Sequence, residues 1–392
     1  MIELSRAADR LEGQKMFQIL AKTKEMERNG KEVIHFEIGD PDFNTPKNIV
    51  EATYESLRKG ETHYSSSSGI LELKVAAAEV TQKSRGFKPE LNQLLVTPGA
   101  NSQIFYALAC VGNPGEDIII PDPSFVSYKS LINFLGMNPV KVPLREENNF
   151  RLNPNDVEKA ITPKTKMIII NSPSNPTGAV MKENEIQEIY KLAERKNIFL
   201  LSDEIYARMV YKDSEVKFTS PSKYDECKER TIVVNGFSKS YAMTGWRLGV
   251  VTAPSYLVDK MGLLLESTTS CVSPFIQRAG AEALRGSQEE IFNMIGEFKK
   301  RRDLTVSKLN DLPGVKCNKP DGTFYAFPNI KETGLSSQKF TDTMLEEAGV
   351  ALCPGNYFGE SGEGYVRLCY ANSLENIDRG IERMKGVLKP YT

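Results

Sequence analysis

Short apolar runs rich in β-branched residues alternate with longer amphipathic stretches through the middle of the chain. The strand-like runs are residues 94–97, 118–120, 166–170, 198–201 and 231–234. The helical patterns between them include residues 101–111 and 183–195. Strands that are apolar on both faces and separated by helices are typical of βαβ units around a mostly parallel sheet. The pattern therefore predicts an α/β fold in which helices cover both faces of the sheet.

The two ends of the chain follow a different pattern. Residues 11–29 and 289–309 have the spacing of helices, and short strand-like runs lie at 324–327 and 365–368. We therefore expect a smaller α+β domain, assembled from both termini beside a large central domain. The expected parts are an N-terminal arm with part of the small domain (1–45), the large domain (46–286) and the C-terminal small domain (287–392).

Polar and glycine-containing motifs lie directly after several of these strands, at residues 97–100, 171–175, 202–204 and 236–239. Ligands of open α/β sheets bind outside the carboxyl ends of the parallel strands. The sequence therefore predicts one functional site at this edge of the sheet.

The composition excludes several kinds of partner. The 392-residue chain has 50 Lys and Arg against 51 Asp and Glu, a formal charge of −1, so no basic surface for nucleic acid is expected. No apolar run approaches the ~20 residues that span a bilayer. The N-terminus has no apolar signal segment, so a cytoplasmic protein is expected. The six cysteines form no Cys-x-x-Cys pair, and His35 and His63 lie apart, so no metal site is expected.

The run from Gly236 to Gly249 places a lysine beside two phosphate-binding side chains. The amine of Lys239 can form a Schiff base with an aldehyde. The hydroxyl of Ser238 and the guanidinium of Arg247 are groups that hold a phosphate dianion. An aldehyde that carries a phosphate describes pyridoxal 5′-phosphate, PLP. A lone Ser–Lys pair would indicate an ordinary surface loop, but the full run resembles the lysine signature of class I and II aminotransferases.

Residues 33–391 resemble the fold-type I PLP-dependent aminotransferases. Within that family the resemblance is to the aspartate aminotransferase-like branch. Four motifs carry it: Asn175-Pro176-Thr177-Gly178, Asp203-Glu204-Ile205-Tyr206, the run from Ser238-Lys239 to Arg247, and Tyr365-Val366-Arg367-Leu368. It implies a large domain with a mostly parallel seven-stranded sheet between helices, and a smaller α+β domain. It also implies a homodimer with shared active sites.

The resemblance assigns the catalytic roles to Lys239, Asp203 and Tyr206. Asp203 would keep the pyridine nitrogen of PLP protonated, so that the ring can accept electrons from the substrate Cα. Tyr206 would bond the phenolic oxygen of the ring. Asn175 would contact the same oxygen and the substrate carboxylate, through a cis peptide to Pro176. Taken singly, Asp203 would be interpreted as a helix N-cap and Tyr206 as a packing aromatic.

The other cofactor-binding residues that the resemblance implies lie at further strand ends. Gly99, Ala100 and Asn101 open a helix whose free N–H groups favour a phosphate. Phe125 would stack on the pyridine ring, and Tyr64 would reach the phosphate from the partner subunit.

Two more residues are implied for the substrate. Arg367 would bind the α-carboxylate bidentately, which a lysine cannot do. The backbone N–H of Gly39 would bind the same group. By itself, an arginine on an alternating strand would indicate a solvent-facing side chain.

The sequence departs from the family pattern at positions that bear on the cofactor and on specificity. Gly236 stands where relatives often have a phosphate-binding serine, which leaves that role to Ser238 alone. Asn101 stands where one aspartate-specific subgroup has a lysine. Another subgroup takes an arginine from the segment after the lysine motif, and here no arginine lies between Arg247 and Arg278. Both recognised ways to bind a distal carboxylate are therefore absent.

A third departure concerns the N-terminal segment that caps the substrate pocket. Met16 and Phe17 occupy it and make the pocket apolar, unless they form an ordinary amphipathic helix face. We therefore expect aspartate to be a poor amino donor, with Arg208 as a candidate to reach an acidic side chain.

These observations predict an aminotransferase that moves an amino group from an L-amino acid to a 2-oxo acid, with 2-oxoglutarate as the expected acceptor, through a Schiff base on Lys239. One alternative is a PLP-dependent elimination or cyclisation on the same fold, which would not consume an oxo acid stoichiometrically. Another alternative is a non-catalytic PLP-binding or regulatory domain. The presence of Lys239 makes this alternative less favoured than an enzyme. The amino donor itself cannot be named from the fold.

Overall fold

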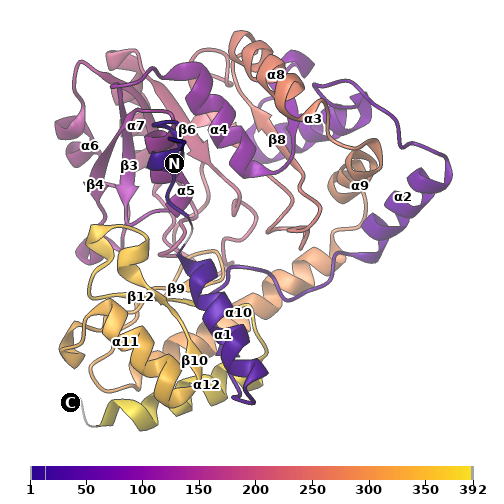
Figure 1. Ribbon diagram of the computed structural model, residues 1–392. Coiled ribbons are helices and arrows are strands. Elements are labelled where there is room, and N and C mark those ends of the chain that lie inside the picture. Colours follow the sequence, from indigo (N-terminus) through magenta and orange to yellow (C-terminus); the bar gives the residue numbers. More distant parts are fainter. Residues whose placement is uncertain (1, 14, 390–392) are drawn as a thin grey trace.

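The computed structural model describes residues 2–13 and 15–389 (Figure 1). The α-helices are α1 (Met16–Arg28), α2 (Lys47–Arg58), α3 (Leu71–Arg85), α4 (Ala100–Val111), α5 (Val126–Phe134), α6 (Pro154–Ala160), α7 (Glu183–Lys196), α8 (Ser255–Thr269), α9 (Pro274–Arg285), α10 (Glu289–Asn310), α11 (Ser337–Thr343) and α12 (Leu374–Leu388). The strands are β1 (Ile34–His35), β2 (Leu94–Thr97), β3 (Asp117–Asp122), β4 (Asn138–Pro143), β5 (Thr165–Asn171), β6 (Phe199–Asp203), β7 (Thr231–Val234), β8 (Gly249–Thr252), β9 (Tyr325–Ala326), β10 (Val350–Ala351), β11 (Cys353–Pro354) and β12 (Val366–Cys369). Within the described ranges, none of the helices is long and apolar enough to cross a membrane.

A seven-stranded sheet forms the centre of the larger part, in the order β2-β8-β7-β6-β5-β3-β4. Strand β8 runs antiparallel to both of its neighbours, and the pairs among β7, β6, β5, β3 and β4 are parallel. This arrangement confirms the predicted α/β fold with a mostly parallel sheet. It also brings the carboxyl ends of β5, β6 and β7 to one edge, where the candidate motifs begin.

Alternate side chains of the central strands enter two different cores, as the period of a strand requires. Ile118 and Ile120 pack with residues of α4, α5 and α8 on one face. Ile119 and Ile168 pack with residues of α6 and α7 on the other face. The strands are apolar on both sides because helices cover both sides, which Figure 1 shows around the sheet.

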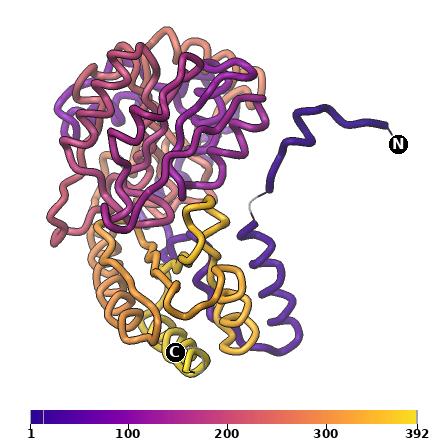
Figure 2. The backbone as a smooth tube through the Cα atoms, turned by 90° about the vertical axis from the view of Figure 1, so that its left-hand side faces the viewer, coloured from indigo at the N-terminus to yellow at the C-terminus, as the bar shows by residue number. Residues whose placement is uncertain are grey.

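The smaller part combines both ends of the chain, as predicted. Strand β1 pairs with β10, and β11, β12 and β9 form a second small sheet. Ile34 and Phe36 from the N-terminal side pack in one core with Phe298 of α10 and Ile377 of α12. Figure 2 shows α1 beside the yellow C-terminal helices, below the larger part. The residue boundaries given above for the three parts stay a prediction.

Two predicted elements are shorter in the structure. The helix expected over 11–29 begins at Met16; Gln14 lies outside the described residues, and residues 11–13 are not helical. Before α1 the chain instead runs along α5, where the Ser130 hydroxyl donates to the Glu12 carbonyl at 2.9 Å. The strand expected over 324–327 is only Tyr325–Ala326. Phe327 leaves this strand to stack on Tyr365 in a different core.

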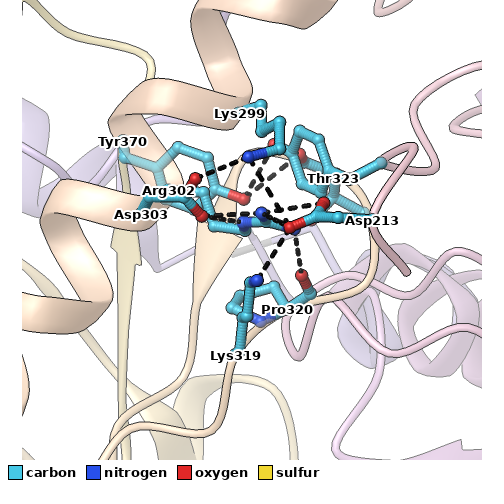
Figure 3. Close-up of polar contacts among 9 residues, drawn as sticks. Asp213, Lys299, Arg302, Asp303, Lys319, Pro320, Thr323 and Tyr370 are labelled. Carbon is cyan, nitrogen blue, oxygen red and sulfur yellow. Dashed lines mark hydrogen bonds and ion pairs between the residues drawn. The ribbon is translucent and has the colours of Figure 1, made fainter. Parts of the chain in front are cut away.

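A buried arginine joins α10 to the segment that follows β6. Arg302 is 1% exposed, and its Nη2 donates to the two carboxylate oxygens of Asp213 at 3.0 and 2.7 Å. Its guanidinium lies 4.4 Å from the centre of the Tyr211 ring, and the Tyr211 hydroxyl donates to the Thr323 carbonyl at 2.5 Å. Figure 3 shows Arg302, Asp213 and Tyr370 converging near Thr323. The Tyr370 hydroxyl lies 3.0 Å from that of Tyr211. The cluster fixes the segment that leads into β9 against the larger part.

Candidate active site

A cavity of about 280 Å³ lies at the carboxyl ends of the central strands. It brings together residues from both parts of the molecule that are far apart in the sequence. Its lining includes the predicted site residues Gly39, Ala100, Asn101, Phe125, Asn175, Asp203, Tyr206, Ser238, Lys239, Arg247 and Arg367. Gly99 precedes α4 at the same edge. Tyr64 is 87% exposed on the loop between α2 and α3 and does not line this cavity.

Lys239 presents its amine to the cavity from the turn that follows β7. Its Nζ donates to the Gly39 carbonyl at 2.5 Å. Burial lowers the pKa of Lys239 to about 8, against a smaller opposing effect of Asp40. A large fraction of the amine is therefore neutral near pH 8, the state in which it can act as a nucleophile or accept a proton. A side chain at Gly39 would overlap the Tyr325 hydroxyl, so the close approach of this loop requires glycine.

Asp203 ends β6 and is 4% exposed. Its carboxylate accepts from the Tyr128 hydroxyl at 2.5 Å and from the Ile205 N–H at 3.2 Å. Burial raises the pKa of Asp203 to about 6, while the bond from Tyr128 acts in the opposite direction. A cation beside this carboxylate would favour its charged form. Asp203 can therefore hold a protonated ring nitrogen.

Arg367 is 1% exposed, so the interpretation of a solvent-facing arginine is wrong. Its Nη1 donates to Asn175 Oδ1 at 3.0 Å, and its Nη2 donates to the Glu37 carbonyl at 2.6 Å. Within the described chain its Nε has no hydrogen-bond partner. A buried guanidinium with an unused donor can bind a carboxylate that enters the cavity. The Asn175–Pro176 peptide is cis, as predicted.

Tyr325 connects the residues at this end of the cavity, and sequence reasoning did not identify it. Its hydroxyl lies 2.9 Å from that of Tyr206. Its ring centre lies 4.6 Å from the guanidinium carbon of Arg367, in a cation–π contact. Tyr325 and Tyr206 are separated by more than a hundred residues, so only the fold reveals the pair.

The opposite end of the cavity has the features of an anion site. Gly99 has a left-handed φ of 86° at the start of α4. A Cβ at Gly99 would lie 2.5 Å from Nη2 of Arg247, so glycine leaves room for that guanidinium. The helix N-terminus, the Ser238 hydroxyl and Arg247 can together hold a phosphate. A Cβ at Gly236 would lie 2.9 Å from the terminal methyl of Ile205 and 3.3 Å from the Leu248 carbonyl oxygen, so a serine there would crowd this turn.

The structure corrects the expectation for Arg208. This residue lines a different cavity, where its Nη1 donates to Gln288 Oε1 at 3.1 Å and its guanidinium lies over the Tyr241 ring. In this arrangement Arg208 does not line the active-site cavity. Met16, Phe17 and Ile38 line the active-site cavity, which makes part of its wall apolar.

Sequence reasoning also missed two residues that form hydrogen bonds with the site residues, of which Asn171 itself lines the cavity. The run from Phe125 contains Tyr128, whose hydroxyl meets Asp203. Asn171 ends β5, accepts from the Asn175 N–H at 2.9 Å and donates to the Asp203 carbonyl at 3.0 Å. Their only sequence signal was proximity to strand ends and to motif residues.

Comparison with known proteins gives the family. The family model described as "Aminotransferase class I and II" matches residues 31–384. The aromatic-amino-acid aminotransferase 2 of Thermococcus litoralis is 45% identical over 91% of this chain and 92% of that protein. The aspartate aminotransferase of Pyrococcus abyssi is 44% identical over 92% of each chain. A crystal structure of the aromatic aminotransferase from Pyrococcus horikoshii, 42% identical, matches with a TM-score of 0.89 over 94% of this chain and 99% of that one. The chain belongs to the class I and II aminotransferases.

Proposed function

We propose that this aminotransferase binds PLP in the cavity around Lys239 and uses that lysine for catalysis. The observation that carries the proposal is the arrangement of three groups in one cavity. The Lys239 amine, the Asp203 carboxylate and the Arg247 guanidinium of the anion site line the same cavity. An aldehyde, a pyridine nitrogen and a phosphate are the groups that such an arrangement fits.

The residues that would hold PLP come from several elements. The pyridine nitrogen would contact Asp203, and the ring oxygen would contact Asn175 and Tyr206. The face of the ring would stack on Phe125. The residues that would bind the phosphate are Gly99, Ala100, Asn101, Ser238 and Arg247. Tyr64 would reach the phosphate from the partner subunit, which makes a homodimer part of the proposal. The exposure of Tyr64 in the single chain supports this role, since its side chain is free to contact another copy.

The chain's own residues then perform the remaining work. Bound PLP supplies an electron-accepting ring that stabilises negative charge at the substrate Cα. Arg367 orients the substrate by its carboxylate, and Nζ of Lys239 accepts the proton from Cα because its lowered pKa keeps a neutral fraction available. Asp203 retains the proton on the ring nitrogen. Amino-group transfer is completed when a 2-oxo acid, for which we propose 2-oxoglutarate, binds to the same arginine.

We expect aspartate to be a poorer donor than neutral or aromatic amino acids, with kcat/KM lower by about tenfold or more. A distal carboxylate in this cavity would lose its hydration beside Met16, Phe17 and Ile38 without gaining a dedicated cation. The cations that line the cavity, Lys239, Arg247 and Arg367, are assigned to the cofactor and the α-carboxylate. Steady-state kinetics with a panel of donors and 2-oxoglutarate measures this preference.

The variant Asn101→Lys is the matched test, because it introduces the missing cation into the cavity wall. It should raise kcat/KM for aspartate and leave the neutral donors less affected. Aspartate exceeding every neutral and aromatic donor in the unmodified enzyme would show that the pocket has been misinterpreted.

The same panel tests the reaction type. Glutamate must form in equal amount to the 2-oxo product, whereas release of ammonia without glutamate would indicate elimination.

A further inference from the structure

A chain of charged groups leads from the end of α1 to the arginine in the active-site cavity. The ring of His35 lies between two carboxylates, with Nε2 3.0 Å from Glu27 Oε1 and Nδ1 2.8 Å from Glu37 Oε1. Glu27 is in the last turn of α1, and Glu37 follows β1. The Glu37 backbone carbonyl accepts from Arg367 Nη2 at 2.6 Å. The ring of His35 therefore connects α1 to the peptide that holds Arg367.

The buried carboxylate of Glu37 depends on His35 for charge compensation more than an exposed carboxylate would. Its side chain is 0% exposed, and within the described chain its Oε2 has no hydrogen-bond partner. A buried carboxylate requires a paired charge. His35 supplies that charge, and its own side chain is 33% exposed. Loss of the imidazolium would leave the Glu37 carboxylate uncompensated beside the carbonyl that positions Arg367.

The other end of α1 lies in the active site. Met16 and Phe17 line the cavity, and Met16 packs with Cys353 and Phe358. An α-helix moves largely as one body when its hydrogen bonds are intact. An anchor at Glu27 therefore also restrains the first turn, where the substrate would be covered.

We propose that His35 is a positioning residue, which fixes α1 over the cavity through Glu27 and holds the Glu37 carbonyl against Arg367. The proposal rests on the proposed role of Arg367 in binding the substrate carboxylate. It assigns His35 no contact with substrate or cofactor. Its effect is on the affinity of the site for a carboxylate, because both ends of the bridge act on groups that surround the bound substrate.

The charge state of His35 is consistent with this role. Only the imidazolium has a proton on each ring nitrogen, so only the cation can donate to both glutamates. The Glu37 contact, opposed by burial and supported by Glu27, raises the pKa of His35 to about 9. Because the pKa is raised on folding, the stabilisation is fully present below pH ~6.5 and is lost as the pH rises through about 9. The neighbouring Asn372, which donates to the His35 carbonyl, carries no charge.

The test compares His35→Gln and Glu27→Gln with Glu25→Gln, an exposed residue of the same helix whose side chain is not part of the bridge. Backbone hydrogen exchange over α1 is measured in the protein without cofactor, and KM and kcat are measured in the loaded enzyme. We expect both bridge variants to exchange α1 amides about tenfold faster and to raise KM for the amino donor about tenfold, with kcat within about twofold. Glu25→Gln should match the unmodified protein in every measurement.

Two results would overturn the proposal. Unchanged exchange in both bridge variants would show that the bridge does not restrain α1. Faster exchange with unchanged KM would show that the bridge is structural and does not position the site. Arg367→Lys, measured in parallel, tests the proposed function separately: if that variant leaves KM unchanged, the carboxylate role of Arg367 fails, and the exchange data still decide whether His35 restrains α1.

Discussion

Lys239→Ala is expected to lower kcat by at least about a thousandfold, because it would remove both the proposed covalent attachment of the cofactor and the proposed base at the substrate Cα. The amine lies inside the cavity, 2.5 Å from the Gly39 carbonyl, and its pKa is lowered to about 8. Borohydride should reduce the bond between cofactor and enzyme irreversibly. Peptide mapping of the reduced protein should then place the adduct on Lys239.

The control for this prediction is an exposed lysine far from the cavity. Lys191 lies on the outer side of α7 and is exposed, so Lys191→Ala should retain full activity and the same adduct. A stable adduct on any lysine other than Lys239 would contradict the assignment. So would Lys239→Ala retaining more than about a tenth of the turnover, a loss of less than ~1.4 kcal/mol in transition-state stabilisation.

The central strands could be predicted because their environment is uniform. Ile168 and its neighbours in β5 are buried on both faces, so the run is continuously apolar and easy to recognise. Strand β4 was missed because it lies at the edge of the sheet, is only partly buried and contains Pro139 and Pro143. Strand β8 was missed because it has only four residues and the first of them, Gly249, is also the last residue of the lysine run.

The site could be predicted where a residue belongs to a motif at a strand end. Asp203 and Lys239 are of this kind, and the cavity contains both. The role of Tyr325 could not be predicted, because it depends on contacts with Tyr206 and Arg367 that no local sequence pattern encodes. Arg208 was interpreted wrongly for a related reason. It follows Tyr206 by two residues, but the turn directs the two side chains into different cavities.

The environment of Asp203 controls two properties of its carboxylate, its charge and its orientation. The proposed role requires the buried side chain to stay ionised, and burial, partly opposed by its hydrogen bonds, raises its pKa to about 6. The Tyr128 hydroxyl, 2.5 Å away, lowers the pKa and fixes one oxygen. The Ile205 N–H fixes the other oxygen at 3.2 Å. The carboxylate is therefore held in one orientation, with its charge available to a cation in the cavity.

Asp203→Asn should retain much of the bound cofactor and lose at least about a hundredfold in kcat, because a neutral amide cannot stabilise the ring N–H⁺ that draws electrons from Cα. Absorbance of the bound cofactor and steady-state turnover measure the two effects separately. Tyr128→Phe is the matched control: it removes only the hydroxyl that orients Asp203, so its loss of turnover should be smaller than that of Asp203→Asn. A loss below about tenfold in Asp203→Asn, or ~1.4 kcal/mol, would mean that Asp203 is not the partner of the ring nitrogen.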